Sequence, residues 1–515
     1  MGEETSSLSC RIASLVHAHF DGLPARSKPT VRPDGTREWI PMSGIVLVKG
    51  EGTPDEALTC VAVTSGAKCL SASQVPKCKG LVLHDWHAEI LALRAFNYWL
   101  LTECQSFLAQ EQAQKLSDEK KGPFSPYIRR RRARQDLPST TPPFELSPDL
   151  KIYMYCTCAP CGDASMELCM AAQDDPTPWE VPTTTANEAE SEELLDGRAH
   201  FSRLGIVRRK PSRADAEATR SKSCSDKLAL RQVSSLLSFE SSLFVATTEN
   251  AYLEGVAMPE GEISQVGCER CFGADGRMGD LKGKFWPELA QSDKEEEEEE
   301  DRRYGWRFRP FRVLSVPNAH FESLWAFGKS DPIDSSEASE ASALKKSKPA
   351  VISAVWAGAP SLLLPLRGVD NGAKSLPKLH GSRTGLYETI INGVKQGNRA
   401  SEPLARGASA LSRARLWGLS KEIVQSTTHQ HDHVSGVDTG VEGKQLTTGL
   451  HVPTQIAEAQ TYREFKKEPA VLTESLKARR IAILDAKNIL RGWAPNLGDE
   501  SWGLEVLIDP KKRKR

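Results

Sequence analysis

The 515-residue sequence lacks a large net charge, a long apolar run and a secretion signal. Its formal net charge is −1, so any surface for nucleic acid must be a local patch. No apolar run is long enough to cross a bilayer. The first residues, MGEETSSLSC, lack the basic and apolar regions of a signal peptide. The 12 cysteines therefore favour reduced thiols or metal ligands over disulfides, and we expect neither secretion nor a membrane partner.

The patterns along the chain predict a mixed α/β first half and a mostly helical second half. Two β-branched runs around a Gly/Pro/Asp turn within residues 44–69 predict a hairpin, and KIYMYCT at 151–157 predicts a buried strand. LFVATTE, near residue 243, is a further strand candidate. HAEILALRAFNYWLL, SCSDKLALRQVSSLL and residues 461–493 have the spacing of helices.

Polar, low-complexity stretches interrupt these patterns. We expect a single domain over residues 1–505 with disordered insertions, and a basic tail at 506–515. PKKRKR in the tail is either a nuclear-import signal, which we favour, or a solvated end. We therefore expect the protein in the nucleus, the cytoplasm or both. The expected insertions are residues 108–148, 173–199, 291–303, 330–348 and 425–450.

The motif HAE places His87 and Glu89 two residues apart, just ahead of an apolar helix. A hydrolytic zinc site needs three protein ligands, an open position for water and a nearby proton carrier that does not bind the metal. His87 suits the first role and Glu89 the last, while Cys161 of PCG begins a second helix, where a thiol ionises readily. Zinc deaminases combine H-x-E with P-C-x-x-C, but no cysteine stands three residues after Cys161. Cys224, in the polar turn SCSDK, is the candidate third ligand.

Another pairing of the cysteines is possible. Cys158 and Cys161 could form a four-cysteine zinc ribbon with Cys268 and Cys271, since both pairs have the C-x-x-C spacing. That arrangement leaves HAE unexplained, so we favour the site that contains it. We expect His84 to pack or to form hydrogen bonds rather than to bind metal.

HAE, PCGDASM, KPSRAD and SCSDKLAL, in this order, resemble the adenosine deaminases that act on RNA, above all their tRNA-specific branch. The resemblance covers residues 44–493 without the insertions. It implies one deaminase domain, a cytidine-deaminase-like α/β/α sandwich with an added helical region. It also implies that His87, Cys161 and Cys224 hold Zn²⁺ and that Glu89 shuttles the proton.

The same family buries inositol hexakisphosphate in its helical half, which requires several Lys or Arg donors around the ligand. Relatives that edit messenger RNA have an arginine three residues after the SCSDK lysine, where this chain has Leu230, followed by Arg231. Asp85 is expected to link this pocket to the metal site. The contacts implied by motif position are Lys227, Lys395, Tyr462, Lys466 and Trp493.

The resemblance implies hydrolytic deamination of adenosine to inosine in tRNA, at the adenosine 3′ of the anticodon of alanine tRNA. The editors of messenger RNA carry duplex-binding domains ahead of the deaminase, and HAE at residue 87 leaves too few residues for one. No protein partner is implied. The alternatives are a deaminase of messenger RNA or of free nucleosides, and a zinc-bearing RNA-binding scaffold. A scaffold has no need of Glu89.

Two basic stretches are candidate RNA contacts. RRRRAR at 129–134 is either a contact to phosphates or a disordered loop, and charge alone does not separate the two. The stretch around KPSRAD is the better candidate because it lies shortly before a proposed zinc ligand. Its expected contacts are Arg208, Arg209, Lys210 and Arg213.

Overall fold

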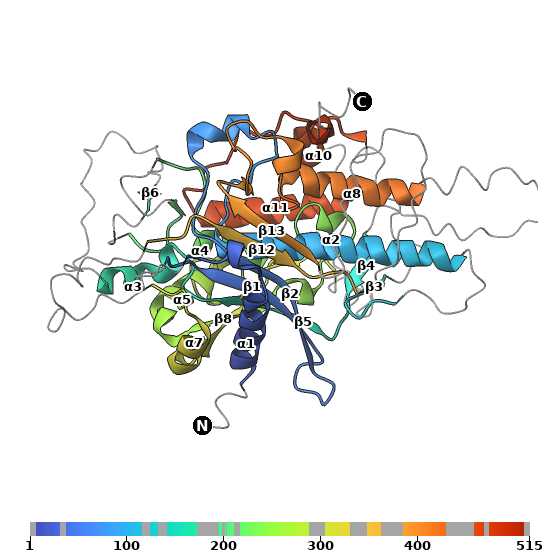
Figure 1. The fold of residues 1–515 in the computed structure, drawn as a ribbon. Helices are drawn as coiled ribbons and strands as arrows, with labels where there is room; N and C mark the ends of the chain where they lie inside the picture. Colours follow the sequence, from blue (N-terminus) through green and yellow to red (C-terminus); the bar gives the residue numbers. More distant parts are fainter. Residues whose placement is uncertain are drawn as a thin grey trace, which may run out of the picture.

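An eight-stranded mixed β-sheet runs through the middle of the molecule (Figure 1). Its strands are β1 (Met42–Lys49), β2 (Ala57–Ser65), β5 (Leu150–Cys156), β8 (Leu253–Pro259), β11 (Arg312–Val316), β12 (Ser353–Ala357), β13 (Leu386–Ile391) and β14 (Val394–Lys395). They lie in the order β11-β8-β5-β1-β2-β12-β13-β14. β8 runs parallel to β5 and β11, and the other neighbours are antiparallel.

The computed structural model describes residues 7–30, 38–115, 124–131, 142–172, 195–197, 201, 203–210, 217–287, 304–329, 348–361, 385–428, 458–467 and 473–508. Short paired strands lie outside the main sheet: β3 (Ile128–Arg130) with β4 (Phe144–Leu146), β6 (Leu195–Asp196) with β7 (Arg208–Arg209), and β9 (Phe285–Trp286) with β10 (Trp306–Arg307). None of the described helices combines the length and the apolar character that a membrane crossing needs.

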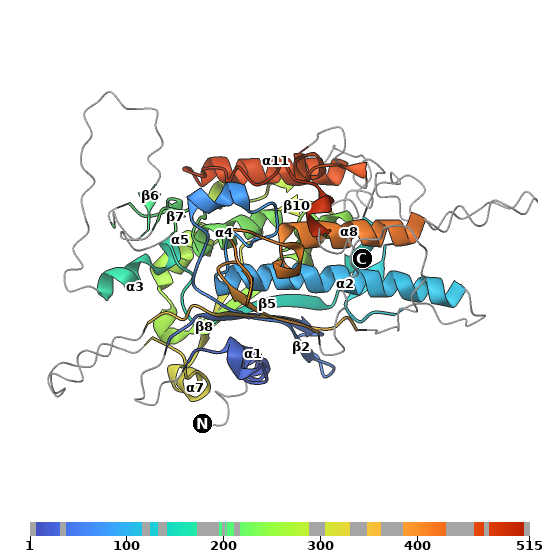
Figure 2. The ribbon, with the colours of Figure 1, turned by 45° about the horizontal axis from the view of Figure 1, so that its top comes forward.

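Helices cover both faces of the sheet (Figure 2). They are α1 (Leu8–Asp21), α2 (Ala88–Lys115), α3 (Met166–Ala171), α4 (Cys224–Ser234), α5 (Gln265–Phe272), α7 (Asn318–Leu324), α8 (Arg413–Thr428), α10 (Tyr462–Lys467) and α11 (Glu474–Ile489). α1 and α7 lie on one face, while α2 lies on the other, with α8 and α11 beyond it. These layers confirm the predicted α/β fold class with an added helical region.

Burial on both faces explains the unbroken apolar run in β1. Successive side chains of a strand point to opposite faces. Ile45 and Leu47 accordingly join the apolar cluster that contains α2, whereas Val46 and Val48 join the cluster under α1. A strand with helices on both sides has no polar face, so its sequence reads as a continuous apolar stretch.

One end of the sheet gathers the loops that build the site. β1 begins where β2 and β5 end, because Ser43 pairs with both Thr64 and Cys156. β12 begins where β13 ends, with Ser353 opposite Ile390. The segments that follow β2, β5 and β13 and those that precede β1 and β12 therefore meet at this end.

The hairpin, the strand at KIYMYCT and the helices at HAEIL and SCSDK are confirmed, but two secondary-structure predictions are wrong. LFVATTE forms no strand: Val245 makes an isolated bridge to Phe144, and the nearest strand of the sheet is β8. The second half is not mostly helical, because it supplies the four strands β11 to β14. Each of these is six residues or fewer, too short to show a clear period.

Parts of the expected insertions are regular structure. α2 continues to Lys115, β3 pairs with β4 inside the range 108–148, and α8 continues to Thr428. Most of the remaining insertion residues, and residues 509–515 of the basic tail, lie outside the part of the chain that the structure describes.

Candidate functional site

His87 and Glu89 lie where α2 begins, directly against the end of β2. The Ala88 amide donates a hydrogen bond to the Gly66 carbonyl at 2.9 Å. Gly66 has a φ of +152°, and a Cβ atom there would lie 2.0 Å from the carbonyl oxygen of Trp86. Only glycine lets β2 come this close to the HAE turn. The motif is thus both the start of a helix and part of a tightly packed turn.

Cys161 and Cys224 come from two loops that dock onto each other. Cys161 follows β5, and Cys224 begins α4, whose N-cap residue Ser223 accepts a hydrogen bond from the Asp226 amide. Gly162 has a φ of +109°, and a Cβ atom there would lie 2.2 Å from Oγ of Ser223. The glycine of PCG therefore allows the loop after β5 to approach the start of α4.

The three predicted ligands converge. Nδ1 of His87 lies 3.8 Å from Sγ of Cys161 and 3.6 Å from Sγ of Cys224, and the three atoms lie within 4.8 Å of one another. Tetrahedral coordination, with Zn–S bonds of about 2.3 Å and Zn–N bonds of about 2.0–2.1 Å, separates sulfur and nitrogen by ~3.6 Å. The hydrogen bond with Cys224 outweighs burial and holds the pKa of Cys161 well below its ordinary value. Spacing and thiolate character both suit a zinc ion.

Glu89 is buried beside this cluster, with 3% of its surface exposed. Burial first, and then the charge of Cys161, raise the pKa of its carboxyl. A raised pKa makes a carboxylate a stronger base, which suits a group that takes a proton from water. Glu89 is not one of the three clustered ligands, so its carboxyl is available for proton transfer.

Asp85 links the HAE turn to the buried Lys210 and the partly buried Lys227. Its Oδ1 accepts a hydrogen bond from the His87 amide at 3.0 Å, and its Oδ2 accepts from Nζ of Lys210 at 2.8 Å and from Nζ of Lys227. Burial alone would raise the pKa of Asp85, but the two lysines outweigh it and hold the pKa well below the usual value. Lys210 also donates to Sγ of Cys224 at 3.3 Å, so one carboxylate orients both the histidine and a lysine next to the thiol.

Arg208 and Lys210 are buried, but both line the large cavity described below, so their role as RNA contacts stays a prediction. Arg208 is 1% exposed and Lys210 is 4% exposed, and the lysine is neutralised by Asp85. Arg208 and Arg209 form β7, and Lys210 follows this strand directly. Arg209 lines the cavity described below, and Arg213 lies outside the described residues. A basic run in the sequence did not reveal which of its members face solvent.

RRRRAR is ordered where the structure describes it. Arg129 and Arg130 lie in β3 and form ion pairs with Glu145 at 2.6 Å and Glu111 at 2.5 Å. The disordered-loop alternative is wrong for these two residues, whose charges are matched by protein carboxylates. Residues 132–134 lie outside the described part of the chain.

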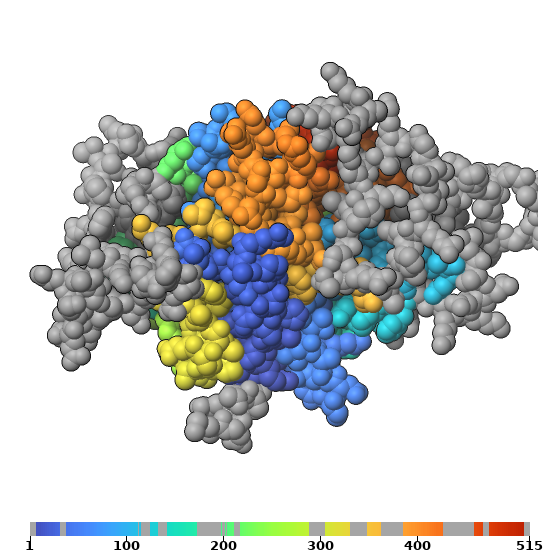
Figure 3. Space-filling model, in the orientation of Figure 1, coloured from blue at the N-terminus to red at the C-terminus, as the bar shows by residue number. Residues whose placement is uncertain are grey.

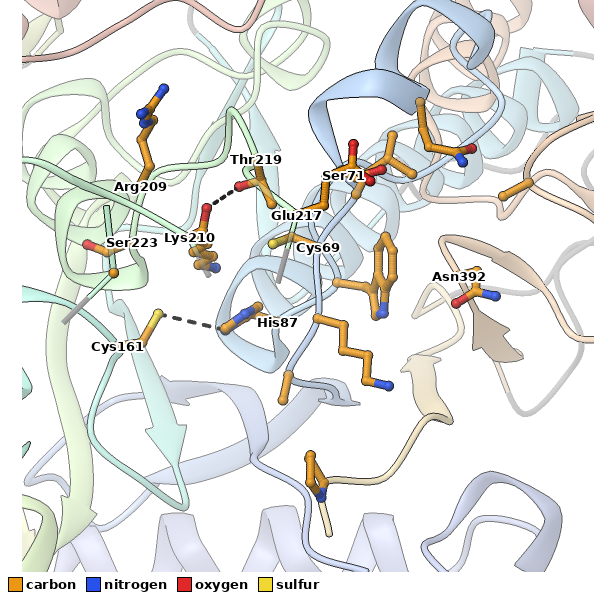
Figure 4. A pocket seen from close by; sticks show the side chains of 18 of the residues that line it. Cys69, Ser71, His87, Cys161, Arg209, Lys210, Glu217, Thr219, Ser223 and Asn392 are labelled. Atoms are coloured by element: carbon orange, nitrogen blue, oxygen red, sulfur yellow. Dashed lines mark hydrogen bonds between the residues drawn. The ribbon is translucent and has the colours of Figure 1, made fainter. Parts of the chain in front are cut away.

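A cavity of about 870 Å³ opens beside the cluster (Figure 4). His87 and Cys161 lie on one side of it, and Asn392 lies across from them. Figure 3 shows two of the contributing segments, residues 348–361 in gold and 385–410 in orange, next to the blue N-terminal part of the chain. This volume lies in the upper part of the range for small-molecule sites. The cavity is therefore large enough for a nucleoside and more.

A second cavity, of about 310 Å³, lies among α2, α4, α10 and α11. Burial lowers the pKa of Lys466 to about 8, and Glu240, 3.7 Å from its ammonium, opposes that shift. Glu240 is the one acidic side chain among the described residues of the lining. The cationic side chains of the lining are Arg94, Lys227, Arg231, Lys466, Arg479 and Lys487. Six cations against one carboxylate form a site that a polyanion would neutralise.

The structure places most of the predicted polyanion contacts in this second cavity. The four that line it are Lys227, Tyr462, Lys466 and Trp493. Asp85 reaches it through Lys227. Lys395 does not line it, which is a correction: it lies in β14 at the edge of the sheet, paired with Ile390. Arg231, next to Leu230, supplies a cation in the region where relatives carry their arginine.

Several cations of the second cavity were missed from the sequence. Arg94 lies on α2, whose apolar pattern drew attention to packing alone. Arg479 and Lys487 are eight residues apart on α11, on a stripe beside the buried Ala478 and Ala486. Basic residues at i and i+8 next to a stripe of buried alanines were the available signal.

His84 forms hydrogen bonds, as expected. Its Nε2 lies 2.9 Å from Oδ2 of Asp499. Cys78 lies close enough to these two residues to form a second group with metal-ligand spacing. However, the Asp499 carboxylate already accepts from the Gly80 amide at 2.8 Å and faces the Arg413 guanidinium at 3.5 Å. The group is satisfied as a buried hydrogen-bond network.

The four-cysteine ribbon is not formed. Within the described residues, Cys268 and Cys271 join neither Cys158 nor Cys161 in a group with metal-ligand spacing. Both lie buried on α5, where Sγ of Cys271 contacts Oδ2 of Asp163 at 3.1 Å. They therefore pack α5 against the turn after β5.

Comparison with known proteins agrees with this site. Residues 62–270, which include the ligand cluster and the buried glutamate, match the adenosine-deaminase (editase) domain. The chain is 28% identical over 499 residues to tRNA-specific adenosine deaminase 1 of Schizosaccharomyces pombe, covering 97% of both chains. It is 32% identical over 229 residues to the Saccharomyces cerevisiae protein of that name, covering 44% of this chain and 52% of that one. Double-stranded RNA-specific editase B2 of Rattus norvegicus is 30% identical over 125 residues, which are 24% of this chain and 14% of that one.

Proposed function

Because this chain belongs to the adenosine deaminases that act on RNA, we propose that it converts adenosine to inosine in tRNA. The position that we propose is the adenosine 3′ of the anticodon of alanine tRNA. The choice of tRNA as the substrate is supported by the alignment, over 97% of both chains, with a relative named for tRNA. The match to a duplex-RNA editase, over 24% of this chain, supports duplex RNA less well.

The proposed reaction depends on zinc held by His87, Cys161 and Cys224. Three protein ligands are the number that catalytic zinc sites use. The sulfur–nitrogen distances of 3.6 and 3.8 Å support this assignment. When bound, zinc supplies a Lewis acid that makes the attacking water more acidic.

Glu89 carries the proton in this proposal. Its carboxylate takes a proton from the water that attacks C6 of adenine, while the target base lies in the large cavity, out of the loop's stack. The carboxyl then returns the proton to the exocyclic nitrogen, the C6–N bond breaks, and ammonia leaves. The raised pKa of Glu89 suits a group that must accept and release the same proton.

To identify the substrate, purified protein is incubated in separate samples with the alanine tRNA anticodon stem-loop, a long RNA duplex and free adenosine. Inosine is read by reverse-transcription sequencing for the RNAs and by chromatography for the nucleoside. We expect inosine in the stem-loop, at the adenosine 3′ of the anticodon. Inosine in the duplex or the nucleoside alone would replace the proposed substrate. No inosine in any sample, with one zinc bound per chain, would favour an RNA-binding scaffold.

Cys161→Ala and Cys224→Ala should each lose most of the bound zinc and all measurable turnover. Each change removes one of three ligands, and a thiolate cannot be replaced by a methyl group at the metal. Metal content per chain is measured by inductively coupled plasma mass spectrometry. Cys169→Ala, in α3 and outside the cluster, is the matched control and should keep its zinc. Full zinc content in both cluster variants would contradict the assignment.

We also propose that the second cavity holds inositol hexakisphosphate. The excess of cations supports a polyanion there, and Nε of Arg479 is a buried donor without an acceptor among the described residues. A bound ligand would accept such donors and compensate the lowered pKa of Lys466. Lys227 connects this cavity to the HAE turn through Asp85.

Arg479→Ala should lower both the bound inositol phosphate and the melting temperature. The reason is the loss of a charge-assisted donor from a site whose ligand offsets buried positive charge. Native mass spectrometry reads the ligand directly as added mass. Arg480→Ala is the control, because Arg480 is exposed and does not line the cavity. Unliganded wild-type protein, stable and fully active, would refute the proposal.

A further inference from the structure

Trp39 lies at the same end of the sheet as the ligand cluster. It precedes β1 by three residues, and it lines the large cavity together with His87, Cys161 and Asn392. Figure 4 shows His87 and Cys161 on one side of this cavity and Asn392 on the other. The cavity thus has a second region, away from the metal ligands, that the deamination chemistry does not use.

The backbone of Trp39 is fixed on both sides. Its amide donates to the Lys348 carbonyl at 2.9 Å, and its carbonyl accepts from the Ala350 amide at 2.9 Å. These bonds form an isolated parallel bridge to Pro349, which also lines the cavity. A half-buried indole held this way loses little freedom when a ligand stacks on it.

One side of the indole ring is already covered. Nζ of Lys329 lies 5.0 Å from the ring centroid, a cation–π contact, and Lys329 is not part of the cavity lining. The lysine therefore contacts the ring from outside the lining, while Trp39 itself forms part of the cavity wall. A rigid aromatic surface on the wall of a nucleoside-sized cavity is what base stacking requires.

The cavity has the size and the polar groups to hold more than one base. Its volume of about 870 Å³ lies near the upper end for sites that enclose one drug-sized molecule. The described lining also offers amide and guanidinium groups from Asn392, Asn398 and Arg399, which suit base edges and phosphate. The Asn392 side chain reaches the cavity from a tight turn in which Asn392 and Gly393 have φ values of +52° and +79°.

We propose that Trp39 is the stacking platform for an unpaired base that neighbours the target adenosine in the RNA loop. This positioning role rests on the proposed function, since it assumes that a single-stranded loop enters the cavity. One base reaches the metal cluster, and its neighbour stacks on Trp39. Such an enzyme distinguishes a loop from a continuous duplex, because only the loop offers an unpaired base next to the target.

The test combines Trp39→Ala and Trp39→Phe with stem-loops that carry an abasic site on either side of the target. On the intact loop, Trp39→Ala should lower kcat/KM roughly ten- to one-hundred-fold, mostly through KM, because that is the worth of one base–aromatic stack. Trp39→Phe should recover most of the loss. At one of the two flanking positions, the abasic site should cost the wild type a similar factor and cost Trp39→Ala almost nothing further.

Trp356→Ala is the matched control, a half-buried tryptophan in β12 that does not line the cavity. It should leave KM within about twofold of wild type, as expected for a site that does not touch the RNA. Abasic sites that cost Trp39→Ala and wild type the same factor at both positions would overturn the stacking role while leaving tRNA deamination intact. A wild type inactive on every loop would overturn the proposed function, and this inference with it.

Discussion

Glu89→Gln should slow inosine formation by about 100- to 10,000-fold, the range for loss of a general acid–base group. The amide has the same shape as the carboxyl but cannot carry a proton between the water and the leaving nitrogen. Glu89 is 3% exposed, and burial followed by the charge of Cys161 raises the pKa of its carboxyl. The rate is measured as a single turnover on the anticodon stem-loop with enzyme in excess.

Zinc content separates this effect from damage to the metal site. The glutamine variant should hold one zinc per chain and melt close to the wild type, because Glu89 is not one of the clustered ligands. Near-normal turnover in a zinc-loaded Glu89→Gln protein would remove the proton-carrier role from this residue. Low turnover together with lost zinc would assign Glu89 to the metal instead.

Asp85→Asn should destabilise the fold by about 3–5 kcal/mol, the cost of removing one partner from a buried ion pair. Asp85 is 6% exposed and faces the ammonium groups of Lys210 and Lys227. The neutral amide would leave the buried Lys210 and the partly buried Lys227 without a counter-charge, and it would weaken the hydrogen bond that orients His87. Urea unfolding with circular dichroism gives the free energy of unfolding.

A surface pair provides the control for this prediction. Asp149 lies 3.9 Å from Lys49 with both side chains substantially exposed, so Asp149→Asn should cost about 0–1 kcal/mol. Adding Lys210→Met to Asp85→Asn should recover part of the loss, because it removes one of the stranded cations. Equal costs for Asp85→Asn and Asp149→Asn would contradict the account of a buried charge network.

The ligand cluster was predictable because each ligand sits in a short motif next to a turn and a helix start. His87 and Glu89 share one turn of chain, and Cys161 and Cys224 each stand where a loop meets a helix. The spacing of residues and the chemistry of turns within a few positions are local properties, which can be read directly from a sequence. HAE follows β2 and PCG follows β5, two strands that flank β1 in the sheet, and the resemblance to the deaminases implied that the motifs converge.

Burial and long-range contacts were not predictable in the same way. Arg208 and Lys210 read as a surface patch, yet the structure turns both inward, where Asp85 neutralises the lysine. The sequence alone does not reveal that Lys210 pairs with the carboxylate of Asp85, which lies 125 residues away along the chain. Arg94 on α2 and Arg479 on α11 line the same second cavity, although the two helices are far apart in the sequence. Charge in a sequence gives sign and number, whereas exposure is decided by tertiary packing.

The strand order also bears on how the protein can be made. The hairpin β1–β2 occupies the centre of the sheet, and β5, β8 and β11 add to one side in the order of their synthesis. β12, β13 and β14 then add to the other side, again in order. Within the described strands of the main sheet, each new strand can therefore join an existing edge, and none must be inserted between two that have already paired. The free edge of β2 stays unpaired longest, until β12 (residues 353–357) has been synthesised. A chain stalled before that point would therefore expose this edge to pairing with other chains.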